Sequence, residues 1–238
     1  MRYPYLSDDD IECAADGLLT QAFGRKIPVP VDLDTVLFDV LAETEQLAFD
    51  DENVLGYEDG DQILGRMWPF RNQIEICASL KTPHSKGRLK GRCRFTVCHE
   101  VGHWRLHRPL HLRARAERSD GLFDTEDTQF HMVSLNRNIF SNVKPPPEEV
   151  QANRFAAHLL IPGSLLRREF LRRFGKSQVV TDPGSTAYET ASELAYRTTR
   201  GISTSLCDAF EVSRQAMAIA LKSRGYVTDE PTFLRGRP

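Results

Sequence analysis

The sequence predicts an α+β protein that is mostly helical, with a small antiparallel sheet and a helical C-terminal region. Three observations lead to this class. Apolar residues recur at helical spacing along most of the 238 residues. Two short segments between residues 60 and 80 instead resemble strands set between polar turns. No stretch approaches the roughly 20 apolar residues of a membrane-spanning helix. We expect one domain at residues 1–165 and a helical region at residues 166–238.

Composition and charge exclude several classes of protein. The chain has 31 Lys and Arg against 33 Asp and Glu, a net charge of −2, so it is not built as a whole to bind nucleic acid or an anionic membrane. Its five cysteines include no C-x-x-C pair, which indicates reduced thiols rather than disulfides or a cysteine zinc site. The N-terminus lacks the apolar segment of a secretory signal. We therefore expect a cytoplasmic protein that does not enter a membrane.

Local patterns predict the first elements. Ser7 can cap a helix, with Asp10 three residues on, and Gly24 can end it. Between these residues the apolar side chains recur at helical spacing. The next predicted elements are a helix at 32–41 and an antiparallel pair of strands at 63–67 and 74–77.

Two later helices contain the polar residues of greatest interest, at 92–107 and 148–160. The connection between them, 109–147, is expected to be irregular and, at this length, functional or mobile. After Pro162 the chain is expected to be helical almost to its end. The predicted helices there are 163–173, 186–199, 203–210 and 213–224.

Residues 95–104 read FTVCHEVGHW and contain the pattern H-E-x-x-H. Four residues apart on a helix, His99 and His103 lie on one face and can reach the same tetrahedral zinc ion. Glu100 is rotated by about 100° around the helix axis, which places it beside the metal, where it can take a proton from an activated water. Gly102 leaves room for another backbone near this face. Two core histidines without a metal are the alternative, but burying them with Glu100 would leave polar groups unsatisfied.

His107 continues the four-residue spacing of this pattern. It lies eight residues after His99, about 12 Å along a helix axis. The two side chains therefore cannot both bind the same zinc ion. We therefore expect His107 at the surface or behind a metal ligand. A metzincin would have histidine and glycine where this chain has Pro109 and Leu106, which excludes that class of zinc protease.

The predicted helix at 148–160 is the best source of a third protein ligand, which a catalytic zinc ion requires. Its first turn holds Glu148 and Glu149, and apolar periodicity does not choose between them. Asn153 is one turn beyond Glu149 on the same face, where it can hold the outer nitrogen of a ligand histidine. This favours Glu149 as the third ligand. Weaker candidates are His111, His131 and His158.

These two segments resemble the ImmA/IrrE family of metallo-endopeptidases. The first block is RFTVCHEVGH at 94–103, and the second is E-x-Q-A-N-x-F-A-A-x-L-L-I-P at 149–162. The order of early helices, small sheet and two metal-binding helices is also similar. The likeness covers roughly residues 10–165, with a weaker similarity near the C-terminus.

The resemblance implies a zincin-like metalloprotease domain of the gluzincin type, with zinc held by His99, His103 and Glu149 and with Glu100 as general base. It also implies a substrate class, helix-turn-helix transcriptional repressors that are cut once so that stress-response or mobile-element genes are switched on. The sequence departs from the family in its longer linker between His103 and Glu149. It also has no fused amino-terminal helix-turn-helix domain, so we expect the repressor to be a separate chain.

Residues 203–226 have the outline of a helix-turn-helix, with two short helices joined near Ser213. The second helix has modest charge for DNA binding, which favours packing or recognition of a repressor instead. The predicted function is that of a regulatory zinc endopeptidase. The alternative is a non-catalytic, zinc-containing regulator that binds DNA or a repressor, although a purely structural site has no use for Glu100.

Overall fold

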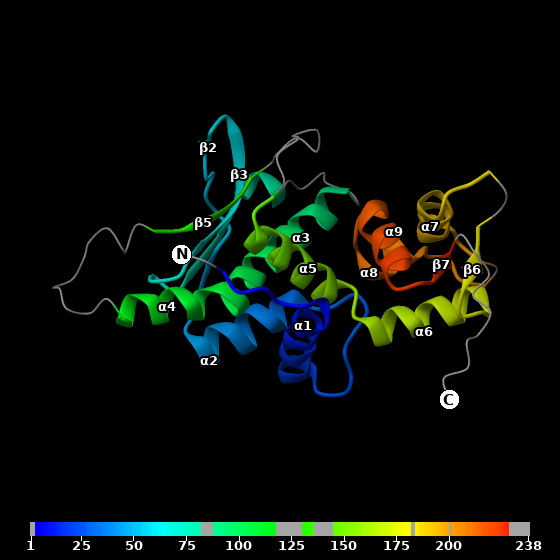
Figure 1. The fold of residues 1–238 in the computed structure, drawn as a ribbon, viewed down its shortest axis with the longest axis horizontal. Coiled ribbons are helices and arrows are strands. Elements are labelled where there is room, and N and C mark those ends of the chain that lie inside the picture. The colour runs from blue at the N-terminus through cyan, green and yellow to red at the C-terminus, as the bar shows by residue number, and fades with distance from the viewer. Residues whose placement is uncertain are drawn as a thin grey trace. The chain divides into compact units, whose positions relative to one another are not determined.

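The computed structural model describes residues 3–81, 88–117, 130–135, 145–181, 184–199 and 201–228 (Figure 1). The chain divides into two compact units, Met1–Leu160 and Ile161–Pro238. Both are rich in helix, and the first also contains a small sheet, so the predicted α+β class is confirmed. Within the described ranges, no helix has the length and apolar character needed to cross a membrane.

The first helix, α1 (Asp8–Phe23), is capped as predicted. The hydroxyl of Ser7 accepts a hydrogen bond from the backbone N–H of Asp10, and the Asp10 carboxylate accepts one from the N–H of Ser7. Gly24 ends the helix with a φ of +59°, a conformation that costs glycine little. The buried face of α1 packs on α5 (Pro147–Leu160).

The second helical run begins close to residue 32, as predicted, and is longer than predicted. It continues through a π-helix, η1 (Thr35–Ala42), into one turn of α-helix, α2 (Glu43–Glu45). The apolar stripe of η1 is buried. The buried residues in η1 are Val36, Leu37, Val40 and Leu41.

A mixed sheet of five strands forms the other half of the first unit (Figure 1). The strands are β1 (Ala48–Asp50), β2 (Tyr57–Glu58), β3 (Asp61–Trp68), β4 (Gln73–Ile76) and β5 (Met132–Leu135). The predicted antiparallel pair is confirmed in β3 and β4, and β2 and β5 also pair with β3 in antiparallel fashion. The short strand β1, which is parallel to β4, was not predicted because three residues hold too little pattern.

The helix with the H-E-x-x-H pattern is longer than predicted. It comprises α3 (Arg88–Gly102), a π-helical turn η3 (His103–His107) and α4 (Arg108–Glu117). The prediction of an irregular 109–147 is therefore wrong at both α4 and β5. The helix continues through Pro109, although proline usually ends a helix. Here Pro109 is the second residue of α4, just after the π-helical turn, a position like the first turn of a new helix, where a missing N–H costs little.

Helices α3 and α5 approach each other very closely, as Gly102 suggested. A Cβ atom on Gly102 would lie 3.1 Å from both Cα and O of Ala152, which is tighter than ordinary packing. A side chain at residue 102 would therefore need the backbone of α5 to move by a few tenths of an ångström. The close approach of the two helices places the first turn of α5 over the histidine face of α3.

The second unit contains the predicted C-terminal helices. They are α6 (Gly163–Phe174), α7 (Ala187–Tyr196), α8 (Leu206–Phe210) and α9 (Arg214–Ser223). Capping boxes at Thr186 and Ser205 start α7 and α8, so α8 begins three residues later than predicted. Two parallel strands, β6 (Val179–Val180) and β7 (Val227–Thr228), were too short to predict.

Candidate metal centre

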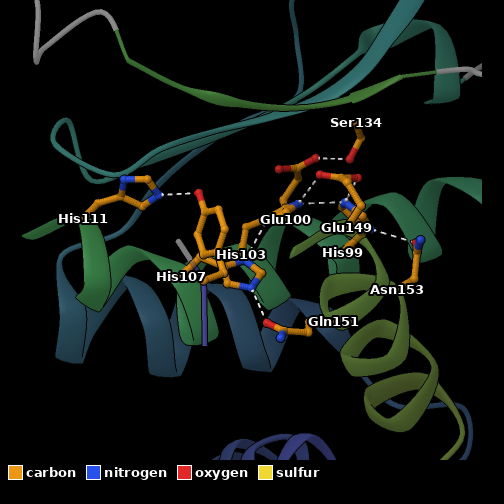
Figure 2. A network of polar contacts seen from close by, with 10 residues as sticks. His99, Glu100, His103, His107, His111, Ser134, Glu149, Gln151 and Asn153 are labelled. Atoms are coloured by element: carbon orange, nitrogen blue, oxygen red, sulfur yellow. Dashed lines mark hydrogen bonds and ion pairs between the residues drawn. The ribbon is translucent and has the colours of Figure 1, made fainter. Parts of the chain in front are cut away.

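His99, His103 and Glu149 converge in the first unit (Figure 2). Their ligand atoms all lie within 4.8 Å of one another. The Nε2 atoms of His99 and His103 are 2.9 Å apart, and the Glu149 carboxylate oxygens lie 3.3 Å from the first and 3.1 Å from the second. Both histidines are buried in this unit. Two imidazoles and one carboxylate in this arrangement can bind a metal ion.

The other candidate third ligands lie elsewhere. Glu148 belongs to a groove lined by residues near Tyr3, α4 and the start of α5, and not to the group of three. His111 lies 3.0 Å from the hydroxyl of Tyr3. The ring of His131 packs against that of Trp68, with centroids 4.5 Å apart. His158 lies 3.3 Å from the carboxylate of Asp8, at the interface of α1 and α5.

Asn153 lies beside His99, one turn beyond Glu149 on α5 (Figure 2). Its Oδ1 atom is 2.9 Å from Nδ1 of His99. Because an amide oxygen only accepts hydrogen bonds, Nδ1 of His99 carries a proton. In a neutral imidazole, Nε2 then presents its lone pair toward His103 and Glu149.

His107 is fully buried, so the first expectation, a position at the surface, is wrong. His107 instead lies behind a candidate metal ligand, which was the second expectation. Its Nδ1 atom lies 2.8 Å from Nδ1 of His103, and its Nε2 atom lies 3.0 Å from Oε1 of Gln151. Gln151 is in the second sequence block, but the pattern gave it no role. Only the packing of α5 on η3 shows which histidine its amide reaches.

The protonation states of the three side chains suit the binding of a cation. Burial opposes a charge on His99, but the carboxylates of Glu149 and Glu100 close to its ring raise the pKa of its imidazole above the ordinary value. Burial lowers the pKa of His103 to about 4, so this imidazole is neutral at pH 7. Burial would raise the pKa of the Glu149 carboxyl, but the imidazoles of His103 and His99 in contact with it outweigh this and lower it. Two imidazoles and an ionised carboxylate form the donor set of a catalytic zinc site.

Glu100 is completely buried between α3 and the sheet. Its Oε1 atom accepts a hydrogen bond from the hydroxyl of Ser134 on β5 (Figure 2). Its Oε2 atom is buried and has no hydrogen-bond partner among the residues that the structure describes. Burial raises the pKa of Glu100 to about 7, against the opposite effects of His99 and Ser134. A carboxyl group with such a pKa is suited to exchange protons near neutral pH.

Glycine on the neighbouring strand makes room for this carboxyl group. A Cβ atom on Gly65 of β3 would lie 2.6 Å from Oε1 of Glu100. Gly65 and Ser134 are paired across β3 and β5, so both face the same side of the sheet. The sequence analysis identified neither residue, because their relation to Glu100 depends on how the sheet covers α3.

Comparison with known proteins identifies a family. The sequence model of peptidase family M78, described as the IrrE N-terminal-like domain, matches residues 89–222, more than half of the chain. Among solved structures, a Mycobacterium tuberculosis transcriptional regulator shows 17% identity and a TM-score of 0.43 over 97% of this chain and 50% of that one. The chain thus spans half the length of that structure. Comparison with curated proteins gives no match.

Proposed function

Because the chain belongs to peptidase family M78, the family of the IrrE N-terminal-like domain, we propose that it is a zinc-dependent endopeptidase. The observation that carries this proposal is the convergence of His99, His103 and Glu149 beside the buried carboxyl group of Glu100. The donor set fits zinc, and the free Oε2 atom of Glu100 fits a general base.

In the proposed reaction the three converging side chains hold the zinc ion and Glu100 moves the proton. A zinc ion held there would supply Lewis acidity, which favours attack of a water molecule on a peptide carbonyl. Glu100 takes a proton from the attacking water at Oε2 and passes it to the amide nitrogen that leaves. Ser134 holds the other oxygen of this carboxylate, so Oε2 is the oxygen left to take the proton. Asn153 orients the imidazole of His99.

The proposed substrate is a helix-turn-helix transcriptional repressor, present as a separate chain in the cytoplasm. The support for this class is the resemblance of residues 94–103 and 149–162 to the ImmA/IrrE metallo-endopeptidases. A single cut would inactivate the repressor and switch on stress-response or mobile-element genes. Such an enzyme needs narrow specificity, so cleavage of a general substrate such as casein is not expected.

A second candidate function is that of a non-catalytic, zinc-containing regulator that binds DNA or a repressor. The helix pair α8 and α9 favours it, because a tight turn at Glu211 joins two short capped helices. Two observations oppose it. The guanidinium Nε of Arg214 donates hydrogen bonds to Ser192 within the same unit, which restrains one of the few cations of α9 against its own unit. The buried carboxyl group of Glu100 also serves no purpose in a structural zinc site.

The test compares wild-type protein with Glu100→Gln, a substitution that preserves shape and removes the proton acceptor. Both are expressed in the native host, and newly formed protein N-termini are identified by mass spectrometry. We expect one or a few new termini in a helix-turn-helix regulator, with wild type alone, while both proteins retain zinc. Equal cleavage by Glu100→Gln would refute the assigned role of Glu100. Identical termini together with salt-sensitive DNA binding would favour the second candidate.

A further inference from the structure

We infer that His107, Gln151 and the backbone carbonyl of Pro4 form a hydrogen-bond relay that fixes the tautomer of His103 and directs its Nε2 lone pair at the metal. His107 and Gln151 are thus positioning residues for the metal centre. The inference rests on the proposed function for the identity of the metal. The relay itself rests on the contacts of four described groups.

The relay begins at a backbone carbonyl group, which has no proton to donate. The carbonyl oxygen of Pro4 can only accept hydrogen bonds, and Nε2 of Gln151 donates one to it over 2.8 Å. This contact joins residues 147 positions apart in the chain. It turns the amide of Gln151 so that Oε1 faces His107.

The orientation of Gln151 determines the proton positions of two buried histidines. Oε1 of Gln151 lies 3.0 Å from Nε2 of His107, so this nitrogen carries the donated proton. In the neutral, fully buried imidazole of His107, Nδ1 is then an acceptor. It lies 2.8 Å from Nδ1 of His103, which must therefore carry a proton. The lone pair of His103 is left on Nε2, the atom that faces His99 and Glu149.

The reversed relay is unfavourable at its far end. It would need a proton on Nδ1 of His107 and a flipped amide at Gln151. The amide oxygen would then lie against the carbonyl oxygen of Pro4, at the 2.8 Å now spanned by a hydrogen bond. Reversal would also place a proton on Nε2 of His103, where it would block metal binding. One backbone carbonyl thus selects the tautomer that can bind metal.

The two candidate ligand histidines are oriented by different hydrogen-bond partners. Asn153 contacts the outer nitrogen of His99 directly. His103 is held through a second histidine, whose own outer nitrogen contacts an amide. His111, four residues further along the same helix face, is also buried but bonds to the hydroxyl of Tyr3 instead. It provides a matched control for the loss of a buried histidine.

The test measures zinc affinity by competition with a chromophoric chelator in the full-length protein. The variants are His107→Phe, Gln151→Leu and the control His111→Phe. Loss of groups that orient a metal ligand typically weakens binding by about 10- to 100-fold. We expect this loss for His107→Phe and Gln151→Leu, and wild-type affinity for His111→Phe. Gln151→Leu keeps every histidine, so it tests the relay even if His107→Phe does not fold.

A second readout reports the tautomers themselves. In zinc-loaded protein labelled with ¹⁵N-histidine, we expect NMR to place the His103 proton on Nδ1 and the His107 proton on Nε2. The inference would be overturned if both relay variants kept the zinc affinity of the wild type. It would also be overturned if Nε2 of His107 carried no proton in the wild-type protein. Failure of the wild type to bind zinc would instead refute the proposed function, so the two failures are distinguishable.

Discussion

At the scale of single residues, Glu100 shows how a buried charge is accommodated. The carboxyl group fits because Gly65 has no side chain, and it is held because Ser134 donates a hydrogen bond to one oxygen. The bond stabilises the ionised form, while burial favours the neutral form. The balance places the pKa of Glu100 at about 7. Ser134 therefore controls the pH range in which Glu100 can accept a proton.

We predict that Ser134→Ala moves the acid limb of the pH–activity profile to higher pH. The hydroxyl lowers the pKa of Glu100, so its removal raises that pKa. A general base must be ionised, and activity is lost as pH falls through its pKa, so the loss begins at a higher pH in the variant. Activity at pH 7 should fall about tenfold, the equivalent of one hydrogen bond to a charged group. The assay is cleavage of a fluorogenic peptide that spans the site found by N-terminal mass spectrometry.

Ser134→Thr is the matched control, because it keeps the hydroxyl and suits a strand. Its acid limb should coincide with that of the wild type. An unshifted profile in Ser134→Ala would contradict the role given to this hydrogen bond.

At the scale of elements, the metal centre depends on how α3 and α5 pack. Two ligand candidates lie on the α3–η3 helix and the third on the first turn of α5. The distances from Glu149 to the two histidines therefore depend on how these helices pack, and Gly102 and Ala152 lie at that contact. The π-helical turn η3 also belongs to this scale, since it contains both His103 and His107 and leads into α4 without a break.

We predict that Gly102→Ala weakens zinc binding and destabilises the protein by about 1–3 kcal/mol, the usual effect of an added carbon in a tight core. The new Cβ atom would meet the backbone of Ala152 at 3.1 Å, and backbone cannot move aside as a flexible side chain can. The helices must separate, which moves Glu149 away from the histidines. Chelator competition and urea unfolding would measure the two effects.

Gly17→Ala is the control for this prediction, because a Cβ atom there meets nothing within 4 Å. In the exposed face of α1 the change should stabilise the protein slightly, since alanine is the better helix former. Equal behaviour of the two variants would show that the close approach of α3 and α5 is not required.

At the scale of the whole molecule, the chain comprises two units, and the candidate ligands all belong to the first. Metal binding should therefore stabilise the two units unequally. A ligand that binds only the native state adds about 2.7 kcal/mol at 100 times its Kd. Within the first unit, this added stability should appear in α3 and α5, the helices whose side chains would bind the metal.

We predict that removal of zinc with a chelator increases amide hydrogen exchange in α3 and α5, and leaves exchange in α7 and α9 unchanged. The reason is that α3 and α5 hold the ligands, whereas the second unit holds none of them. Hydrogen exchange with mass spectrometry resolves these segments. A uniform increase over both units would contradict this assignment, and restoration by added zinc is the control.

Much of this protein could be predicted from its sequence, because the signals were local. The capping box at Ser7, the helical ends near Gly24 and the four-residue spacing of His99 and His103 involve residues within one or two turns of each other. Such patterns depend on backbone geometry that is the same in every helix. The α+β class, the β3–β4 hairpin and the C-terminal helices followed from the same kind of signal.

The rest was decided by tertiary structure, because it depends on residues that are distant in sequence. Periodicity did not distinguish Glu148 from Glu149, and only the close packing of α5 on α3 determines which carboxylate faces the histidines. The bond from Ser134 to Glu100 needs β5 to pair beside Gly65. The relay from Pro4 through Gln151 joins opposite ends of the first unit's sequence. Spacing along a chain predicts which residues share a helix face, but only the packed fold determines what that face meets.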